Sequence, residues 1–133
     1  MIVAFATQGW GGDDEARLKA LLDEVSYALV PFDRHAKWRS CLAILRRCRE
    51  RPPSLLAMEG TGVMGGLALL IAHWTQNVPY IVSSGDAVGP FLSAKFPLGR
   101  ALFTLYEWLL YRNSAGFIGW SPYLTGRALT IGG

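Results

Sequence analysis

Cysteine, histidine and charge are all scarce in this sequence of 133 residues. Charged residues make up 17% of it, and it has two cysteines, Cys41 and Cys48, and two histidines, His35 and His73. Residues seven apart on one helix lie about 10 Å from each other, which is beyond the reach of a disulfide. The cysteines are therefore expected to be core thiols in a reducing compartment. Neither the cysteines nor the histidines have the spacing of a metal site, so we expect no bound metal.

Long hydrophobic runs are also missing. The apolar run from Val63 to Trp74 has about 12 residues, whereas a membrane span needs about 20. Polar residues and a proline within 76–79 interrupt it, which favours a buried helix. The first residues lack the basic segment and long apolar centre of a secretory signal, and acidic residues follow at 13–15. We therefore expect a cytoplasmic protein.

Apolar residues, by contrast, are plentiful. They make up 51% of the chain, which predicts one well-packed domain over residues 1–133 rather than a disordered chain. The formal net charge of +3 gives only weak attraction to phosphates or to an anionic membrane surface. We expect no nucleic-acid partner.

Short apolar runs alternate with segments of helical periodicity along the whole chain. The expected strands are residues 2–7, 27–32, 54–58, 79–84 and 116–120. The expected helices begin near Asp13, Arg34, the glycine turn after Met58, Leu98 and Ser121-Pro122, and residues 87–97 form a loop or short helix. This alternation predicts an α/β fold, a Rossmann-like, doubly wound parallel sheet of about five strands with helices on both faces.

Apolar side chains at helical spacing are expected to face the core of this fold. On the first helix they are Ala16, Leu18, Ala20, Leu21, Leu22 and Val25. On the second they are Trp38, Cys41, Leu42, Leu45 and Cys48. On the aromatic-rich helix from Leu98 to Arg112 they are Phe103, Tyr106, Trp108, Leu109, Leu110 and Tyr111.

Ligands of an open α/β sheet gather at the carboxyl ends of its strands, here the loops 8–13, 59–62, 84–90 and 121–122. Residues 60–65, GTGVMG, match G-x-G-x-x-G, which suggests a dinucleotide turn. The match follows the third strand, however, and the dinucleotide turn normally follows the first. The alternative is that Gly65 and Gly66 permit close helix packing while Gly60 eases the turn. Residues 8–13 lack the Lys-Ser/Thr ending of a P-loop, so nucleotide hydrolysis is not expected.

Four segments follow the first strand in the order GWGGDDEARLKALL, SLLAMEGTGVMGGLALL, VPYIVSSGD and GFIGWSPYLTGRAL. In this order they resemble the N-terminal, acceptor-side domain of a GT-B glycosyltransferase of the family-4 type. In that family a Gly-Gly turn opens the first helix, a G-x-P strand ends in a polar residue or His, and a strand ending in Ser leads into the last helix. The matching positions here are Gly11-Gly12, Val78-Pro79 through Asp86, and Ala115 through Ser121. The resemblance covers nearly the whole chain.

The resemblance implies which residues would line the cleft. The backbone N–H groups of Gly9, Gly11 and Gly12 would face acceptor and donor phosphates. Aromatic rings stack on sugars, so Trp10 and Trp120 are further candidates. The expected substrate-binding set is Gly9, Trp10, Gly11, Gly12, Gly60, Ser84, Gly85 and Ser121.

Two carboxylates are candidates for catalysis. Ser84, Gly85 and Asp86 stand where many relatives carry a His beside the donor sugar. Asp86 can act as a general base on an acceptor hydroxyl, or it can be an N-cap or turn carboxylate. Glu59, at the carboxyl end of the third expected strand, has the same two alternatives.

The resemblance also implies a missing half. Family members bind the nucleotide sugar mainly through a second Rossmann-like domain, and this sequence ends at Gly133 before such a region. We therefore expect an acceptor-binding domain of an enzyme that moves a sugar from a nucleotide-sugar donor to an acceptor hydroxyl, inactive by itself. Its partners would be the donor-binding domain and a sugar or lipid-linked acceptor, with no cofactor beyond the nucleotide sugar. The alternative is a non-catalytic α/β nucleotide-binding or interaction module that uses the GTGVMG turn.

Two surface properties are expected as well. One helix carries the basic residues Arg34, Lys37, Arg39, Arg46, Arg47, Arg49 and Arg51 together with Trp38. It can lie on an anionic bilayer at the inner face of the membrane, or the basic run can be a solvated face. A lone half would expose the apolar rim of its cleft, which predicts self-association.

Overall fold

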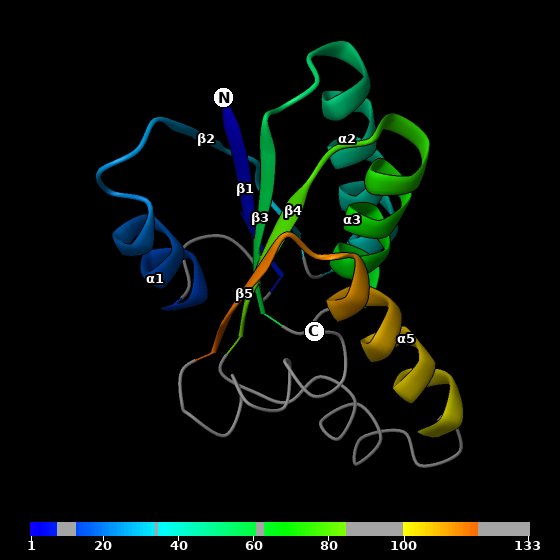
Figure 1. Ribbon diagram of the computed structural model, residues 1–133. Coiled ribbons are helices and arrows are strands. Elements are labelled where there is room, and N and C mark those ends of the chain that lie inside the picture. Colours follow the sequence, from blue (N-terminus) through cyan, green and yellow to red (C-terminus); the bar gives the residue numbers. More distant parts are fainter. Residues whose placement is uncertain (8–12, 34, 61–62, 85–99, 120–133) are drawn as a thin grey trace.

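The computed structural model describes residues 1–7, 13–33, 35–60, 63–84 and 100–119 (Figure 1). Its sheet has five strands: β1 (Ile2–Ala6), β2 (Tyr27–Leu29), β3 (Leu55–Glu59), β4 (Tyr80–Ser84) and β5 (Gly116–Gly119). All of them pair in parallel, in the order β2-β1-β3-β4-β5. The predicted α/β parallel sheet is confirmed.

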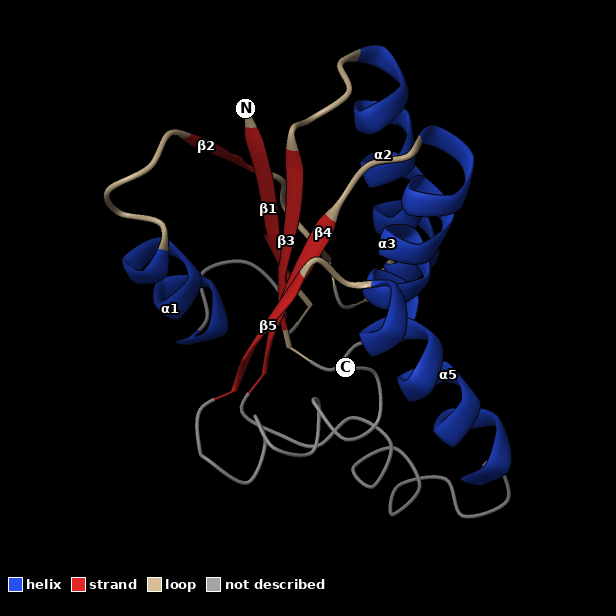
Figure 2. Cartoon of the chain, in the orientation of Figure 1, coloured by secondary structure: helices blue, strands red, loops and turns tan. Residues whose placement is uncertain are grey.

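Four described helices connect and cover the strands. They are α1 (Asp13–Leu21), α2 (Lys37–Glu50), α3 (Val63–Gln76) and α5 (Arg100–Asn113). Helix α1 lies on one face of the sheet, and α2, α3 and α5 lie on the other (Figure 2). The expected last helix from Ser121 and the segment 87–97 lie outside the described residues.

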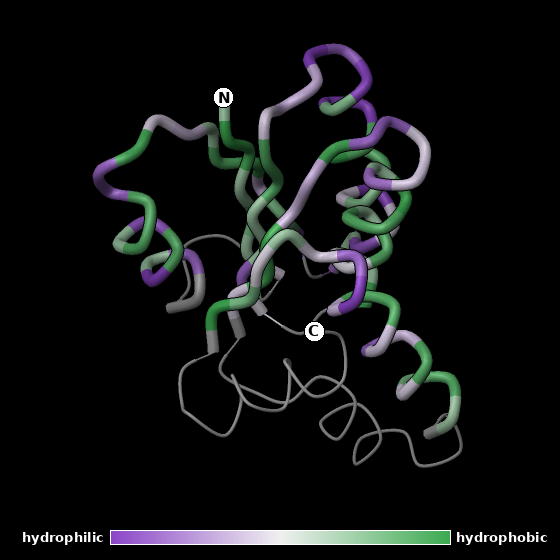
Figure 3. The backbone as a smooth tube through the Cα atoms, viewed as in Figure 1, coloured by the Kyte–Doolittle hydropathy of each residue, from purple (hydrophilic) through white to green (hydrophobic). Residues whose placement is uncertain are grey.

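Strand alternation divides the core into two layers. Val3 and Phe5 of β1 join the cluster under α2, α3 and α5, which also holds Ile44, Leu69 and Tyr80. The smaller cluster under α1 consists of Ala4, Ala6, Leu18, Leu22 and Ala57. The strands therefore carry apolar residues on both faces, as a doubly covered parallel sheet requires. Figure 3 shows hydrophobic colour along most of the length of these strands.

Glycines let α3 approach its neighbours closely. A Cβ atom built on Gly65 would lie 2.5 Å from Thr7 Cγ2 and 2.9 Å from Met58 Sδ. One built on Gly66 would lie 1.8 Å from the hydroxyl oxygen of Tyr106 on α5. Both residues thus serve helix packing, as one of the two sequence interpretations predicts.

Several expected core positions are wrong. On α2, Cys41 and Cys48 are buried with Ile44, whereas Trp38 and Leu42 are exposed. On the other helices the exposed residues among those expected in the core are Ala16, Ala20, Leu21, Val25 and Trp108. The expected buried helix α3 also leaves Ile71 and Trp74 exposed. The apolar arcs of these helices are wider than the strip that the sheet covers, so their flanks stay outside.

The cysteines are free and buried, as predicted. Burial raises the pKa of the Cys41 thiol. It also raises the pKa of the Cys48 thiol, although the nearby Arg47 charge opposes part of that effect. Both groups therefore stay protonated at neutral pH.

Candidate functional site

The strand order places a topological switch point between β1 and β3. The chain passes from β1 to β2 on one side and then returns to β3 on the other side of β1. In a doubly wound sheet the loops at such a point separate, and ligands bind in the crevice outside the carboxyl ends of these two strands. The last described residues at this point are Thr7 after β1 and Glu59-Gly60 at the end of β3.

Glu59 links the two strands at the switch point. It pairs with Ala6 in the β1–β3 register, and its carbonyl accepts hydrogen bonds from the Thr7 N–H at 3.0 Å and the Thr7 hydroxyl at 3.3 Å. These bonds fix the backbone at the carboxyl ends of both strands. The register therefore keeps Glu59 at the carboxyl edge of the sheet.

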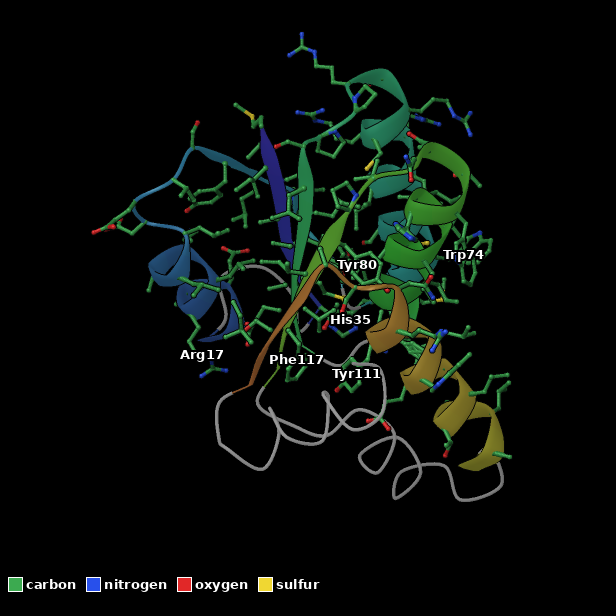
Figure 4. The ribbon with its side chains drawn as sticks, in the orientation of Figure 1. Arg17, His35, Trp74, Tyr80, Tyr111 and Phe117 are labelled. Atoms are coloured by element: carbon green, nitrogen blue, oxygen red, sulfur yellow. The ribbon has the colours of Figure 1, made fainter. Side chains whose placement is uncertain are left out.

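The Glu59 side chain forms an ion pair with Arg17 of α1. Arg17 Nε lies 4.0 Å from Glu59 Oε1, and the exposed fractions of the two side chains are 46% and 2%. A buried carboxylate needs a nearby positive charge to compensate for its lost hydration. The arrangement thus joins a buried acid to a guanidinium that reaches the solvent. In Figure 4, the Arg17 side chain extends from α1 toward the end of the molecule where β5 ends.

Gly60 makes the turn after β3. Its φ is 115°, a left-handed value that favours glycine, and its N–H donates to the Ser83 carbonyl at 2.9 Å. The expectation that Gly60 eases the turn is confirmed. Because this N–H group already donates to Ser83, a ligand at Gly60 must contact other atoms.

The end of β4 completes the described part of the edge. Ser83 pairs with Glu59, and Ser84 pairs with Gly119 of β5. The structure therefore brings Glu59, Gly60 and Ser84 to one edge, as the sequence predicted. The other predicted site residues lie outside the described residues; they are Gly9, Trp10, Gly11, Gly12, Gly85, Asp86, Trp120 and Ser121.

Sequence reasoning missed Arg17 and Thr7. Thr7 ends the first expected strand and Arg17 lies in the first expected helix, but neither belongs to a motif with a known spacing. The contact between Arg17 and Glu59 joins residues 42 positions apart and exists only because β3 lies next to β1 under α1. No local signal in the sequence indicates it.

The histidines and cysteines play no visible ligand role. Across the described ranges, no group of three or more His, Cys, Asp and Glu residues is placed to hold a metal ion. His73 Nδ1 lies 3.2 Å from the Val78 carbonyl, and the ring stands edge-on to Tyr80. His73 therefore fixes the end of α3 to the start of β4. Within the same ranges no helix is long and apolar enough to cross a bilayer.

Comparisons with family models, curated proteins and solved structures find no match to this chain.

Proposed function

We propose that this chain is the acceptor-side domain of a glycosyltransferase, which moves a sugar from a nucleotide-sugar donor to an acceptor hydroxyl. The observation that carries the proposal is the ion pair of Arg17 and buried Glu59 at the switch point between β1 and β3. A sugar-nucleotide site needs cationic groups for phosphate and polar groups for hydroxyls at one crevice. This edge supplies both at the carboxyl ends of β1 and β3.

The exposures of the pair assign different roles to its members. Glu59 is 2% exposed, so an acceptor hydroxyl cannot come within hydrogen-bonding distance of its carboxylate while Arg17 keeps its place. Glu59 is therefore a positioning residue that holds Arg17. The half-exposed guanidinium of Arg17 is the group that meets an anionic part of the substrate, because its planar donors suit phosphate oxygens. Asp86 is our candidate for the general base.

An acceptor-side domain requires a second domain that binds the donor. The donor nucleotide would be held by a second Rossmann-like domain, in the same protein or in a partner chain, and this chain by itself would not transfer sugar. We place the enzyme in the cytoplasm, because the two free, buried cysteines fit a reducing compartment.

The first test uses the complete gene product. Its sequence after Gly133 should encode a second Rossmann-like domain, and the protein should release UDP or GDP from a nucleotide sugar when an acceptor is present. Arg17→Gln should raise the KM for the anionic substrate about tenfold or more, as the loss of one charged hydrogen bond predicts. Glu59→Gln should have a similar but smaller effect.

The control variant changes a second cation on α1. Lys19→Gln changes an exposed cation on the same helix that pairs with Glu15, and it should leave the KM unchanged. The proposal fails if no second domain follows and the protein is stabilised against heat by NAD but by neither UDP- nor GDP-sugars. If the Arg17 and Lys19 substitutions change the KM equally, Arg17 does not contact the substrate.

That contrary outcome would support the second candidate, a dinucleotide-binding module. Two observations favour it: Gly60 has the left-handed turn conformation, and Gly65 allows close contact between helix and strand. These are the tasks of the first and third glycines in a dinucleotide turn. Because β3 adjoins β1, the turn after β3 also lies at the switch point. This module predicts NAD binding that Gly62→Ala abolishes.

A further inference from the structure

The outer side of α2 and α3 exposes large apolar side chains that the core does not use. Trp38 on α2 is 65% exposed and Trp74 on α3 is 56% exposed. Leu42, one turn after Trp38, and Ile71, one turn before Trp74, are exposed as well. Trp74 stands on the side of α3 that points away from the sheet (Figure 4). Soluble domains rarely leave apolar residues of this size gathered on neighbouring helices without a partner.

Basic side chains share this surface. On α2, residues 39, 42, 46 and 49 follow one another at helical spacing, so Arg39, Arg46 and Arg49 form one stripe with Leu42, and all four are exposed. Helix α2 has five basic residues against one acidic residue, Glu50. Helix α3, packed beside it, has no Asp, Glu, Lys or Arg. We call this surface the α2–α3 outer face; its members are Trp38, Arg39, Leu42, Arg46, Arg49, Ile71 and Trp74.

The opposite side of the sheet has the opposite charge. Residues 13–24, which include α1, carry five acidic and two basic residues. Of the described segments, α2 is thus rich in basic residues and residues 13–24 are rich in acidic residues, and Trp38 and Trp74 lie on the side of α2. A partner that fits this face must be anionic and must also accept indole and aliphatic side chains.

We propose that the α2–α3 outer face docks on the surface of an anionic lipid bilayer. Tryptophan and leucine side chains enter the boundary between headgroups and acyl chains, while arginines beside them bind lipid phosphates. Nucleic acid would satisfy the arginines but would leave Leu42 and Ile71 without an apolar environment. This inference goes beyond the proposed function and does not depend on it.

The test is co-sedimentation of the protein with vesicles. Vesicles of phosphatidylcholine mixed with phosphatidylglycerol should bind it, and vesicles of phosphatidylcholine alone should bind it much more weakly. The triple variant R39Q/R46Q/R49Q should lower affinity for the anionic vesicles about a hundredfold, since each cation near the surface contributes about fivefold. The double variant W38A/W74A should lower affinity for the anionic vesicles at least tenfold.

A matched control shows that weaker vesicle binding does not come from loss of folding. Trp108→Ala removes a partly exposed tryptophan from α5, where Arg112 lies 5.2 Å from the indole centroid, and it should bind vesicles as the wild type does. All substituted residues are exposed, so urea unfolding should give similar midpoints for every variant. Brominated lipids should quench the fluorescence of Trp38 and Trp74 in the wild type. This quenching should be missing in the double variant.

Four results would overturn the inference. They are wild-type protein that stays in solution with anionic vesicles, equal vesicle binding by wild type and both variants, tighter binding to RNA than to anionic vesicles, and a dimer in light scattering that W38A/W74A abolishes in the absence of lipid. Loss of vesicle binding with nucleotide release intact would leave the proposed function standing. Loss of nucleotide release with vesicle binding intact would refute the proposed function and leave the membrane inference standing.

Discussion

The two sides of the sheet are built differently. Under α2, α3 and α5 the core consists of large side chains, including Phe5, Ile44 and Leu69, and glycines let the helices approach closely. In the described part of the layer under α1 the fully buried strand residues are alanines, Leu18 and Leu22 are the large buried residues, and the larger strand side chains are only partly buried. The thin side holds the Arg17–Glu59 pair at its carboxyl end. The difference indicates that the thick layer carries most of the stability, while the thin layer leaves room for charged groups at the switch point.

The largest expected effect comes from opening a cavity in the thick layer. Leu69→Ala on α3 should lower the free energy of unfolding by about 4 kcal/mol, because a fully buried leucine among large neighbours leaves a hole that cannot collapse. Leu18→Ala should cost about 2 kcal/mol, since α1 can settle onto the alanines beneath it. Urea unfolding measures both values. An equal or larger loss for Leu18→Ala would refute the contrast between the layers.

A smaller effect is expected from crowding the same layer. Gly66→Ala should cost about 2 kcal/mol, because its new methyl group meets the Tyr106 hydroxyl, which is itself buried. Adding Tyr106→Phe to Gly66→Ala should restore part of the loss, whereas Tyr106→Phe alone should not stabilise the protein. Thermal unfolding of the three variants gives the comparison. If Gly66→Ala unfolds like the wild type, α3 and α5 are not packed as closely as described.

The smallest effect concerns the thiols of the thick layer. Since burial raises the pKa of Cys41 and Cys48, the folded state holds their protons more tightly than the unfolded chain, whose thiols have a pKa of about 9.0. Their contribution to stability is therefore complete below that pH and is lost as the pH rises further. The free energy of unfolding should fall at alkaline pH by less in the variant Cys41→Ser/Cys48→Ser. A thiol reagent should react with both cysteines far more slowly in the folded protein than in urea. Fast reaction of folded protein would show that the layer opens readily.

Much of the fold was predictable because the signals are local. Strands β3 and β4 are short apolar runs between turns, and both lie within about one residue of the predicted bounds. Strand β2 ends at Leu29 rather than at residue 32, although the Val30 N–H still donates to the Ala4 carbonyl. Pro31 has no N–H to continue the pairing. Helix α1 likewise ends at Leu21, four residues before Val25, the last of the apolar residues expected at helical spacing.

The candidate site was predictable only in part. Strand direction alone placed Glu59, Gly60 and Ser84 at one edge, because all parallel strands end on the same side. The partner of Glu59 was not predictable, since Arg17 reaches it through the packing of α1 over β3. Nor could periodicity tell that Trp38 and Trp74 lie outside the core. An apolar arc on a helix says which residues can be buried, and the neighbours decide which ones are.

The sequence by itself determined the alternation of strands and helices and the common direction of the strands, since both follow from short-range patterns and from the length of the connections. Only the tertiary structure decided that β3 lies beside β1, that an arginine of α1 covers a glutamate of β3, and that two tryptophans face outward. These facts depend on contacts between residues far apart in the chain. Such contacts are selected by how the layers fill space together, and no single segment encodes that.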